Sequence, residues 1–157
     1  MAPRLADSAD KAMRLAGTAL QTEAFARRYY AFFNDRRFDE AERLVDPQAL
    51  FSYPAAREHL IGRAGYRELV RRWVEAFPDG RIAITSLDVV GGYAAQTNWI
   101  AEGTHLGLLE LPGLPPIPAT GKHARLPMRE TITIRNGLIT DSRMEFDPAS
   151  LRSALGL

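Results

Sequence analysis

The chain contains no cysteine, so disulfide bonds, a thiolate nucleophile and cysteine-ligated metal sites are all excluded. It also lacks an excess of either charge, since 20 lysine and arginine residues face 19 aspartate and glutamate residues. Nucleic-acid binding is disfavoured, because acidic residues follow each arginine pair within a few positions. The three histidines are too scattered for a known metal-ligand spacing, so we expect no bound metal.

Long apolar runs are also missing, and none approaches the roughly 20 residues of a membrane span. The first residues do not resemble a secretory signal, so we expect a cytoplasmic protein that does not bind membranes. Apolar residues make up 46% of the 157 positions, which is enough for one packed core. We expect residues 21–157 to form a single domain, and residues 1–20 to be a loose or helical extension.

The first half of the chain has the periodicity of helices. Between residues 21 and 34, aromatic side chains recur every three or four positions and predict an amphipathic helix. A short second helix is predicted for residues 39–45, because Asp46-Pro47 would end it. A third helix is predicted for residues 64–77, and Pro78-Asp79-Gly80 would end that one.

The second half alternates between apolar and polar residues, which is typical of β-strands. Strands are predicted for residues 81–90 and 93–104, and for 125–134 and 138–147 around the turn pair Asn136-Gly137. Between these two hairpins, residues 108–118 contain four prolines and are expected to form a lid. Helices followed by antiparallel strands predict an α+β fold with the helices on one side of a strongly bent sheet.

Six short motifs occur in order along the chain. They are Phe77-Pro78-Asp79, Trp99, Gly103-Thr104-His105, Thr120-Gly121-Lys122, Asn136-Gly137-Leu138-Ile139 and Phe146-Asp147. Their order and spacing resemble the SnoaL-like polyketide cyclases, also called ester cyclases, of the nuclear-transport-factor-2-like superfamily. The resemblance covers about residues 22–157. It implies a cone-shaped, mostly antiparallel sheet with three N-terminal helices packed against it, in a homodimer or homotetramer.

The resemblance also implies a reaction, the cofactor-independent aldol ring closure of a polyketide-like ester or ketone in antibiotic biosynthesis. This chemistry removes a proton from carbon, stabilises an enolate and returns a proton, and one carboxylate can make both transfers. Such a carboxylate belongs in an apolar cavity, where lost solvation raises its pKa. The same fold also hosts isomerases, dehydratases, epoxide hydrolases and non-catalytic ligand-binding or association modules, which stay as alternatives.

Asp147 matches the family's aspartate at the end of the last strand and is our first candidate for the acid/base. A second interpretation is open, because Asp147-Pro148 is also a typical helix N-cap followed by proline. Strand alternation places Arg143, Glu145 and Asp147 on one face, so all three would line the cavity together. Glu145 is then the alternative base. Arg143 stands where the family tends to have tryptophan, and it would suit a polar or anionic group on the ligand.

His105 is a further catalytic candidate, because its ordinary pKa near 6.5 lets it carry or polarise a proton. Its alternative role is a structural histidine that hydrogen-bonds the turn after its strand. For contacts with a hydrophobic or aromatic substrate we expect aromatic side chains and, more weakly, a second histidine: Trp99, Tyr53, Tyr30, Phe33 and His123.

One strand leaves its inward face undecided. Met128 and Glu130 alternate with Arg129 and Thr131, so each face of this strand carries one charged residue. The pattern over these four residues does not show which face is turned toward the core.

Overall fold

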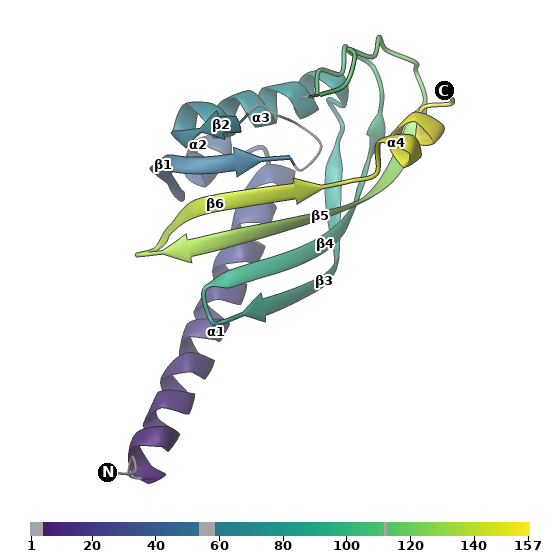
Figure 1. Cartoon of the computed structure of the whole chain (residues 1–157). Helices are drawn as coiled ribbons and strands as arrows, with labels where there is room; N and C mark the ends of the chain where they lie inside the picture. Colours follow the sequence, from purple (N-terminus) through teal and green to yellow (C-terminus); the bar gives the residue numbers. More distant parts are fainter. Residues whose placement is uncertain (1–4, 54–58, 112) are drawn as a thin grey trace.

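A long helix and a strongly curved six-stranded sheet dominate the computed structural model, which describes residues 5–53, 59–111 and 113–157 (Figure 1). The elements of this described part are α1 (Leu5–Asn34), α2 (Phe38–Glu42), β1 (Val45–Ser52), β2 (His59–Ile61), α3 (Gly62–Ala76), β3 (Arg81–Val90), β4 (Ala94–Thr104), β5 (His123–Arg135), β6 (Leu138–Glu145) and α4 (Pro148–Ala154). The predicted α+β class is confirmed, with three helices before the main run of strands.

The strands lie in the order β2-β1-β6-β5-β4-β3, and every neighbouring pair is antiparallel except β1 with β6. β5 and β6 are joined at Asn136 and Gly137, whose φ angles of 52° and 74° are both positive, as a type I′ turn requires. The predicted hairpin is therefore present. Helices α1 and α3 lie on one face of the sheet, which we call the inner face (Figure 1).

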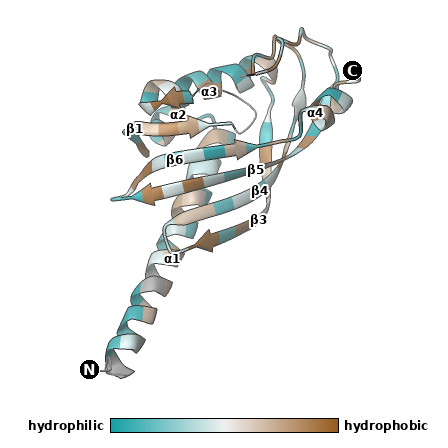
Figure 2. Ribbon diagram, viewed as in Figure 1, coloured by the Kyte–Doolittle hydropathy of each residue, from teal (hydrophilic) through white to brown (hydrophobic). Residues whose placement is uncertain are grey.

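Burial along β5 shows which residues belong to the inner face. Every second residue from Ala124 to Ile134 is buried, and the residues between them are exposed or partly exposed. Hydrophobic and hydrophilic residues accordingly alternate along much of β5 in Figure 2. Each buried leucine, isoleucine or methionine of this face contributes about 1.5–3 kcal/mol through loss of contact with water. Glu130 belongs to this buried series.

Helix α1 begins at Leu5, so the predicted extension is helical over its described residues and continuous with the predicted first helix. Its C-terminal half packs on the sheet with Ala26, Tyr29 and Tyr30 buried at helical spacing. Its N-terminal half extends beyond the sheet and is exposed (Figure 1). No helix in the described part of the chain has both the length and the apolar character needed to cross a membrane.

The segment after α2 differs from the prediction. The second helix ends at Glu42, and residue 45 already begins β1, where we had predicted the end of a helix. Pro47 is accommodated in this strand because the register of β1 against β6 shifts between Val45 and Leu50. β2 was not predicted at all, since three residues are too few to show a periodicity.

Gly62, at the start of α3, offers a test of this packing. Its φ is +69°, and a Cβ atom there would lie 2.4 Å from the carbonyl oxygen of Pro47. Gly137 has a similar φ of +74° but no described atom within 4 Å of such a Cβ, so it is a matched control. We expect Gly137→Ala to cost about 1–2 kcal/mol for the left-handed backbone alone, and Gly62→Ala to cost clearly more. Urea unfolding followed by circular dichroism measures both, and equal costs would contradict the close approach of α3 to β1.

Candidate functional site

A cavity lies between α1 and α3 on one side and the inner face of β4, β5 and β6 on the other. Its volume is about 100 Å³, counted as the space that the centre of a water molecule can occupy. One water needs roughly 10–15 Å³ by this measure, so the cavity has room for several waters or for a small organic ligand. Its walls are mainly apolar, and six of its aromatic residues are Tyr29, Tyr30, Phe33, Tyr66, Trp73 and Trp99.

Glu130 of β5 is a buried acidic residue in this lining, with 1% of its surface exposed. Its Oε1 accepts a hydrogen bond of 2.8 Å from the hydroxyl of Tyr30, on α1. Its Oε2 accepts one of 2.5 Å from the hydroxyl of Ser142, on β6. Ser142 is the diagonal neighbour of Glu130, because Ile132 is its direct partner in the β5–β6 ladder. Three elements therefore meet at one carboxyl group.

The surroundings of Glu130 favour its neutral form. Burial raises the pKa of Glu130, and the hydrogen bonds from Ser142 and Tyr30 act in the opposite direction but more weakly. Within the described residues, no cationic side chain forms an ion pair with it. Burial and the nearby Glu130 also raise the pKa of Tyr30 well above its ordinary value, so the phenol keeps its proton. A carboxyl group in such a place can both accept and return a proton.

Asp147 lies outside the cavity and caps α4. Its carboxylate accepts hydrogen bonds from the hydroxyl of Ser150 (2.8 Å) and the backbone N–H of Ala149 (3.2 Å), and these bonds lower its pKa. The structure thus gives Asp147 the second of its two predicted roles, the N-cap.

The expectation that Arg143 and Glu145 share the cavity with Asp147 is corrected. The alternation at the end of β6 turns Ser142 and Met144 inward, so Arg143 and Glu145 face away from the core. Arg143 pairs with Glu145 there, with Nε 2.9 Å from Oε1. None of these charged side chains lines the cavity.

His105 is fully buried, but it is not part of the cavity lining. The backbone N–H of Thr120 donates to its Nδ1 (3.2 Å), so the proton of the neutral ring is on Nε2. Burial lowers its pKa, and its ring stacks on Phe77 with 5.1 Å between the centroids. This geometry matches the structural alternative, a histidine that anchors the loop after β4.

The predicted ligand-contacting residues divide into two groups. Tyr30, Phe33 and Trp99 line the cavity, and their contact with a ligand stays a prediction. Tyr53 is buried beside Phe146, with 6.2 Å between the ring centroids, and is not in the lining. His123 is exposed, and its Nε2 lies 2.7 Å from Oε1 of Glu102.

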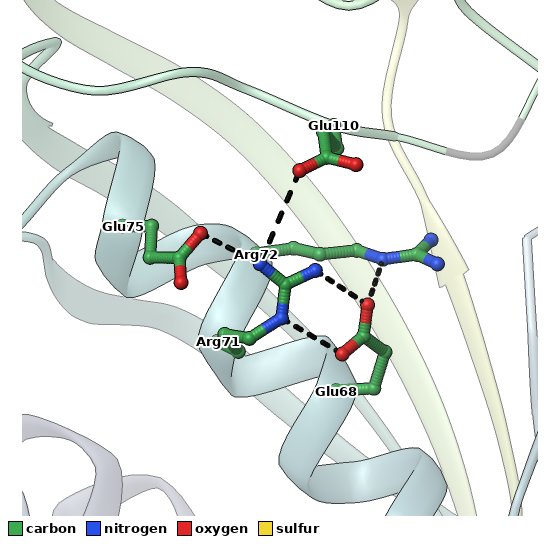
Figure 3. A network of polar contacts seen from close by, with 5 residues as sticks. All are labelled: Glu68, Arg71, Arg72, Glu75 and Glu110. Carbon is green, nitrogen blue, oxygen red and sulfur yellow. Dashed lines mark hydrogen bonds and ion pairs between the residues drawn. The ribbon is translucent and has the colours of Figure 1, made fainter.

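The proline-rich loop, which we expected to be a lid, is attached to α3. Figure 3 shows Arg71 of α3 between Glu68 and Glu75 of its own helix and Glu110 of the loop, whose Oε1 lies 3.9 Å from Arg71 Nη1. Such exposed ion pairs contribute at most about 1 kcal/mol each. Leu109 and Ile117 of the loop are buried and pair with each other across it. The described residues of the loop do not line the cavity.

Glu130 is the site residue that our prediction left undecided. The signal was present in the sequence, but only over the full length of β5. Across residues 124–134, one face has the residues Ala, Leu, Met, Glu, Ile and Ile, while the other has Arg, Pro, Arg, Thr and Thr. A single acidic residue within an apolar face marks a buried carboxyl group.

Comparisons with known proteins agree with this architecture. A family model described as a SnoaL-like domain matches residues 26–142, whereas no curated protein matches the chain. A solved structure of a proposed SnoaL-like polyketide cyclase from Jannaschia sp. CCS1 is 16% identical, with a TM-score of 0.75 over 87% of this chain and 92% of its own. TsrD from Streptomyces laurentii is 23% identical, with a TM-score of 0.69 over 88% and 95%. A proposed ketosteroid isomerase from Kribbella flavida is 20% identical, with a TM-score of 0.61 over 81% and 78%. At these identities the structures share the fold alone.

The raised pKa of Glu130 predicts how stability depends on pH. A carboxyl group with a higher pKa in the fold than in the unfolded chain stabilises the fold in full below about pH 4.3, its ordinary pKa. This contribution is lost as the pH rises through the folded-state pKa. Glu130→Gln stays neutral at every pH, so its free energy of unfolding should rise relative to the wild type between acidic and neutral pH. Urea unfolding across that range measures the difference, with Glu145→Gln as the exposed control. If the difference between the two proteins did not change with pH, the pKa of Glu130 would not be raised in the fold.

Proposed function

The chain belongs to the family of SnoaL-like domains, and we propose that it is an enzyme that moves protons on a small carbonyl compound held in its cavity. The observation that carries this proposal is the buried carboxyl group of Glu130, which two hydroxyl groups hold against an otherwise apolar cavity. A group placed there only for stability would more often be apolar, because burying a carboxyl group is costly.

Proton transfer on carbon suits this arrangement. The ionised form of Glu130 takes a proton from the carbon next to the carbonyl group, and the neutral form returns it to the product. The apolar walls exclude water, which would otherwise compete for the enolate and protonate it. Tyr30 lies 2.8 Å from Glu130 and keeps its own proton, so it can donate a hydrogen bond within the same site.

Within this reaction class, the form that we propose is an aldol-type ring closure of a polyketide-like ester or ketone. The family match supports a cyclase, and the resemblance to solved structures named as cyclases is consistent with it. Isomerisation of an unsaturated ketone needs the same acid/base group and is the alternative. A solved neighbour named as a proposed ketosteroid isomerase has the same fold. Neither assignment needs a role for Asp147, Glu145 or His105 in contact with the substrate.

Replacing Glu130 by glutamine tests the proposal. The amide keeps the shape and the neutral hydrogen bonds of the acid but cannot take up a proton, so turnover should fall by about 10²–10⁴-fold with ligand affinity retained. Ring closure of aromatic polyketide methyl esters is followed by absorbance. Affinity is followed by intrinsic fluorescence, since Trp73 and Trp99 are the only two tryptophans of the chain and both line the cavity.

Two matched controls change exposed carboxylates near the end of β6. Glu145→Gln and Asp147→Asn should leave turnover unchanged, and asparagine also preserves the helix cap. If Asp147→Asn lost turnover and Glu130→Gln kept it, the acid/base would be Asp147 instead. If the wild type bound the esters and neither cyclised nor isomerised any of them, the cavity would belong to a binding module.

A further inference from the structure

We propose that Ser142 directs the proton of Glu130 toward Tyr30, so that the Tyr30 hydroxyl donates to a hydrogen-bond acceptor oxygen on the ligand. Ser142 is not part of the cavity lining, and it acts on the ligand only through the other two residues. The binding part of this inference stands on the geometry alone. Its catalytic consequence rests on the proposed function.

The first step concerns Ser142 itself. Its side chain is buried, with 3% of the residue exposed, and its hydroxyl has one hydrogen-bond partner in the described part of the chain, Oε2 of Glu130. A buried hydroxyl proton without an acceptor costs about 1–3 kcal/mol. Ser142 therefore donates its proton to Oε2, at 2.5 Å.

The second step concerns the acidic proton. A carboxyl oxygen that already carries a proton is a poor acceptor, so the proton of neutral Glu130 belongs on Oε1, the oxygen that Ser142 does not occupy. Oε1 lies 2.8 Å from the hydroxyl oxygen of Tyr30. Glu130 is then the donor and Tyr30 the acceptor of this bond. The hydroxyl proton of Tyr30 is then no longer hydrogen-bonded to Glu130. Because Tyr30 lines the cavity, it can donate this proton in a hydrogen bond to a ligand there.

The third step is what happens when Glu130 is ionised. Both oxygens then accept, one from Ser142 and one from Tyr30, so Tyr30 no longer offers its proton to the cavity. The availability of this donor thus follows the protonation of Glu130. Without Ser142, the acidic proton could rest on Oε2 and Tyr30 could donate to Oε1 at any pH.

These three steps connect to the reaction as follows. A C–H bond of the substrate breaks and its proton forms an O–H bond on Oε1 of Glu130, while the electron pair becomes the enolate double bond. The carbonyl electrons move onto the substrate oxygen. Because Oε1 is now protonated, Tyr30 turns its O–H from Glu130 to that oxygen at the moment when negative charge appears on it. Ser142 is a positioning residue, since it fixes which carboxyl oxygen receives the proton.

The class of ligand follows from the same geometry. The polar end of the cavity takes a ketone or ester oxygen, and it discriminates against a hydrocarbon of the same shape. Acetophenone and α-methylstyrene are a suitable pair of probes, because they differ only in C=O against C=CH₂. Both can be titrated against the intrinsic fluorescence of Trp73 and Trp99.

The experiment measures the carbonyl stretching frequency of bound acetophenone by infrared difference spectroscopy, without any turnover. In the wild type at acidic pH, the band should shift to lower frequency, and the shift should disappear as Glu130 ionises. Tyr30→Phe should remove it at every pH. Ser142→Ala should reduce it and lower the preference for acetophenone over α-methylstyrene about two- to tenfold, as expected for loss of one hydrogen bond.

Three further variants separate this inference from general structural damage. Ser142→Thr keeps the hydroxyl and should restore the shift. Thr22→Val removes another buried hydroxyl, which donates to the backbone carbonyl of Gly92, and should leave the shift unchanged. Glu130→Gln should keep the shift at all pH values, because its amide N–H donates to Tyr30 as the neutral acid does.

The inference is overturned if Ser142→Ala retains the full shift, or if Thr22→Val loses as much as Ser142→Ala. It is also overturned if the wild-type shift does not depend on pH. Failure of the proposed function gives a different result, an intact pH-dependent shift in a protein that converts none of the esters.

Discussion

The two hydrogen bonds that join Glu130 to Tyr30 and Ser142 in the core constrain the positions of α1, β5 and β6 at once. A carboxyl group that has left water must find partners, and here they come from a helix at one side and a neighbouring strand at the other. A displacement of either element would leave an unsatisfied polar group inside an apolar core, which costs more than one ordinary contact. The same bonds that hold the elements together also fix both oxygens of the group. The stability of the fold and the orientation of the carboxyl group for proton transfer therefore depend on the same two hydrogen bonds.

That arrangement depends in turn on the register of the β5–β6 hairpin. Side chains alternate between the two faces of a strand, so a slip of one residue would move Ser142 to the outer face and remove it from Glu130. The turn at Asn136-Gly137 and the register shift between Thr133 and Ile134 together set this register. A local turn and the irregularity beside it thus position a hydroxyl group that lies five residues away along β6. The irregularity between Thr133 and Ile134 shows that the ladder is adjusted next to the turn and regular beside Glu130.

Most of the fold could be predicted from local signals, but the face of β6 that turns toward the cavity could not. The predictions of a strand at 81–90 and of a turn at Asn136-Gly137 agree with the structure, because periodicity and turn type depend on a few adjacent residues. The helix cap at Asp147-Pro148 could also be predicted from these two residues. Which face of β6 turns inward is decided elsewhere, by the side on which α1 and α3 pack. The family's pattern favoured the face that carries Asp147, and the opposite face proved to be the buried one. Glu130 needed the whole of β5 to be considered as one pattern, whereas our prediction compared the two faces over residues 128–131 alone.

The position of Glu130 also limits the charge of what can bind beside it. Arg81 is the cationic residue within the described lining, and it is exposed. Glu130 lies opposite Thr97 on β4, and Arg81 lies opposite Glu102, five residues further along that strand. At about 3.3 Å per residue, the two levels are roughly 16 Å apart. A negative charge next to Glu130 would have no cation of the described lining near enough to offset its desolvation, and it would oppose the ionisation that proton abstraction requires. The outward position of Arg143 removes the cation that had suggested an anionic ligand. A neutral carbonyl group is therefore the form of substrate that this end of the cavity favours, and it gains negative charge only as the proton leaves.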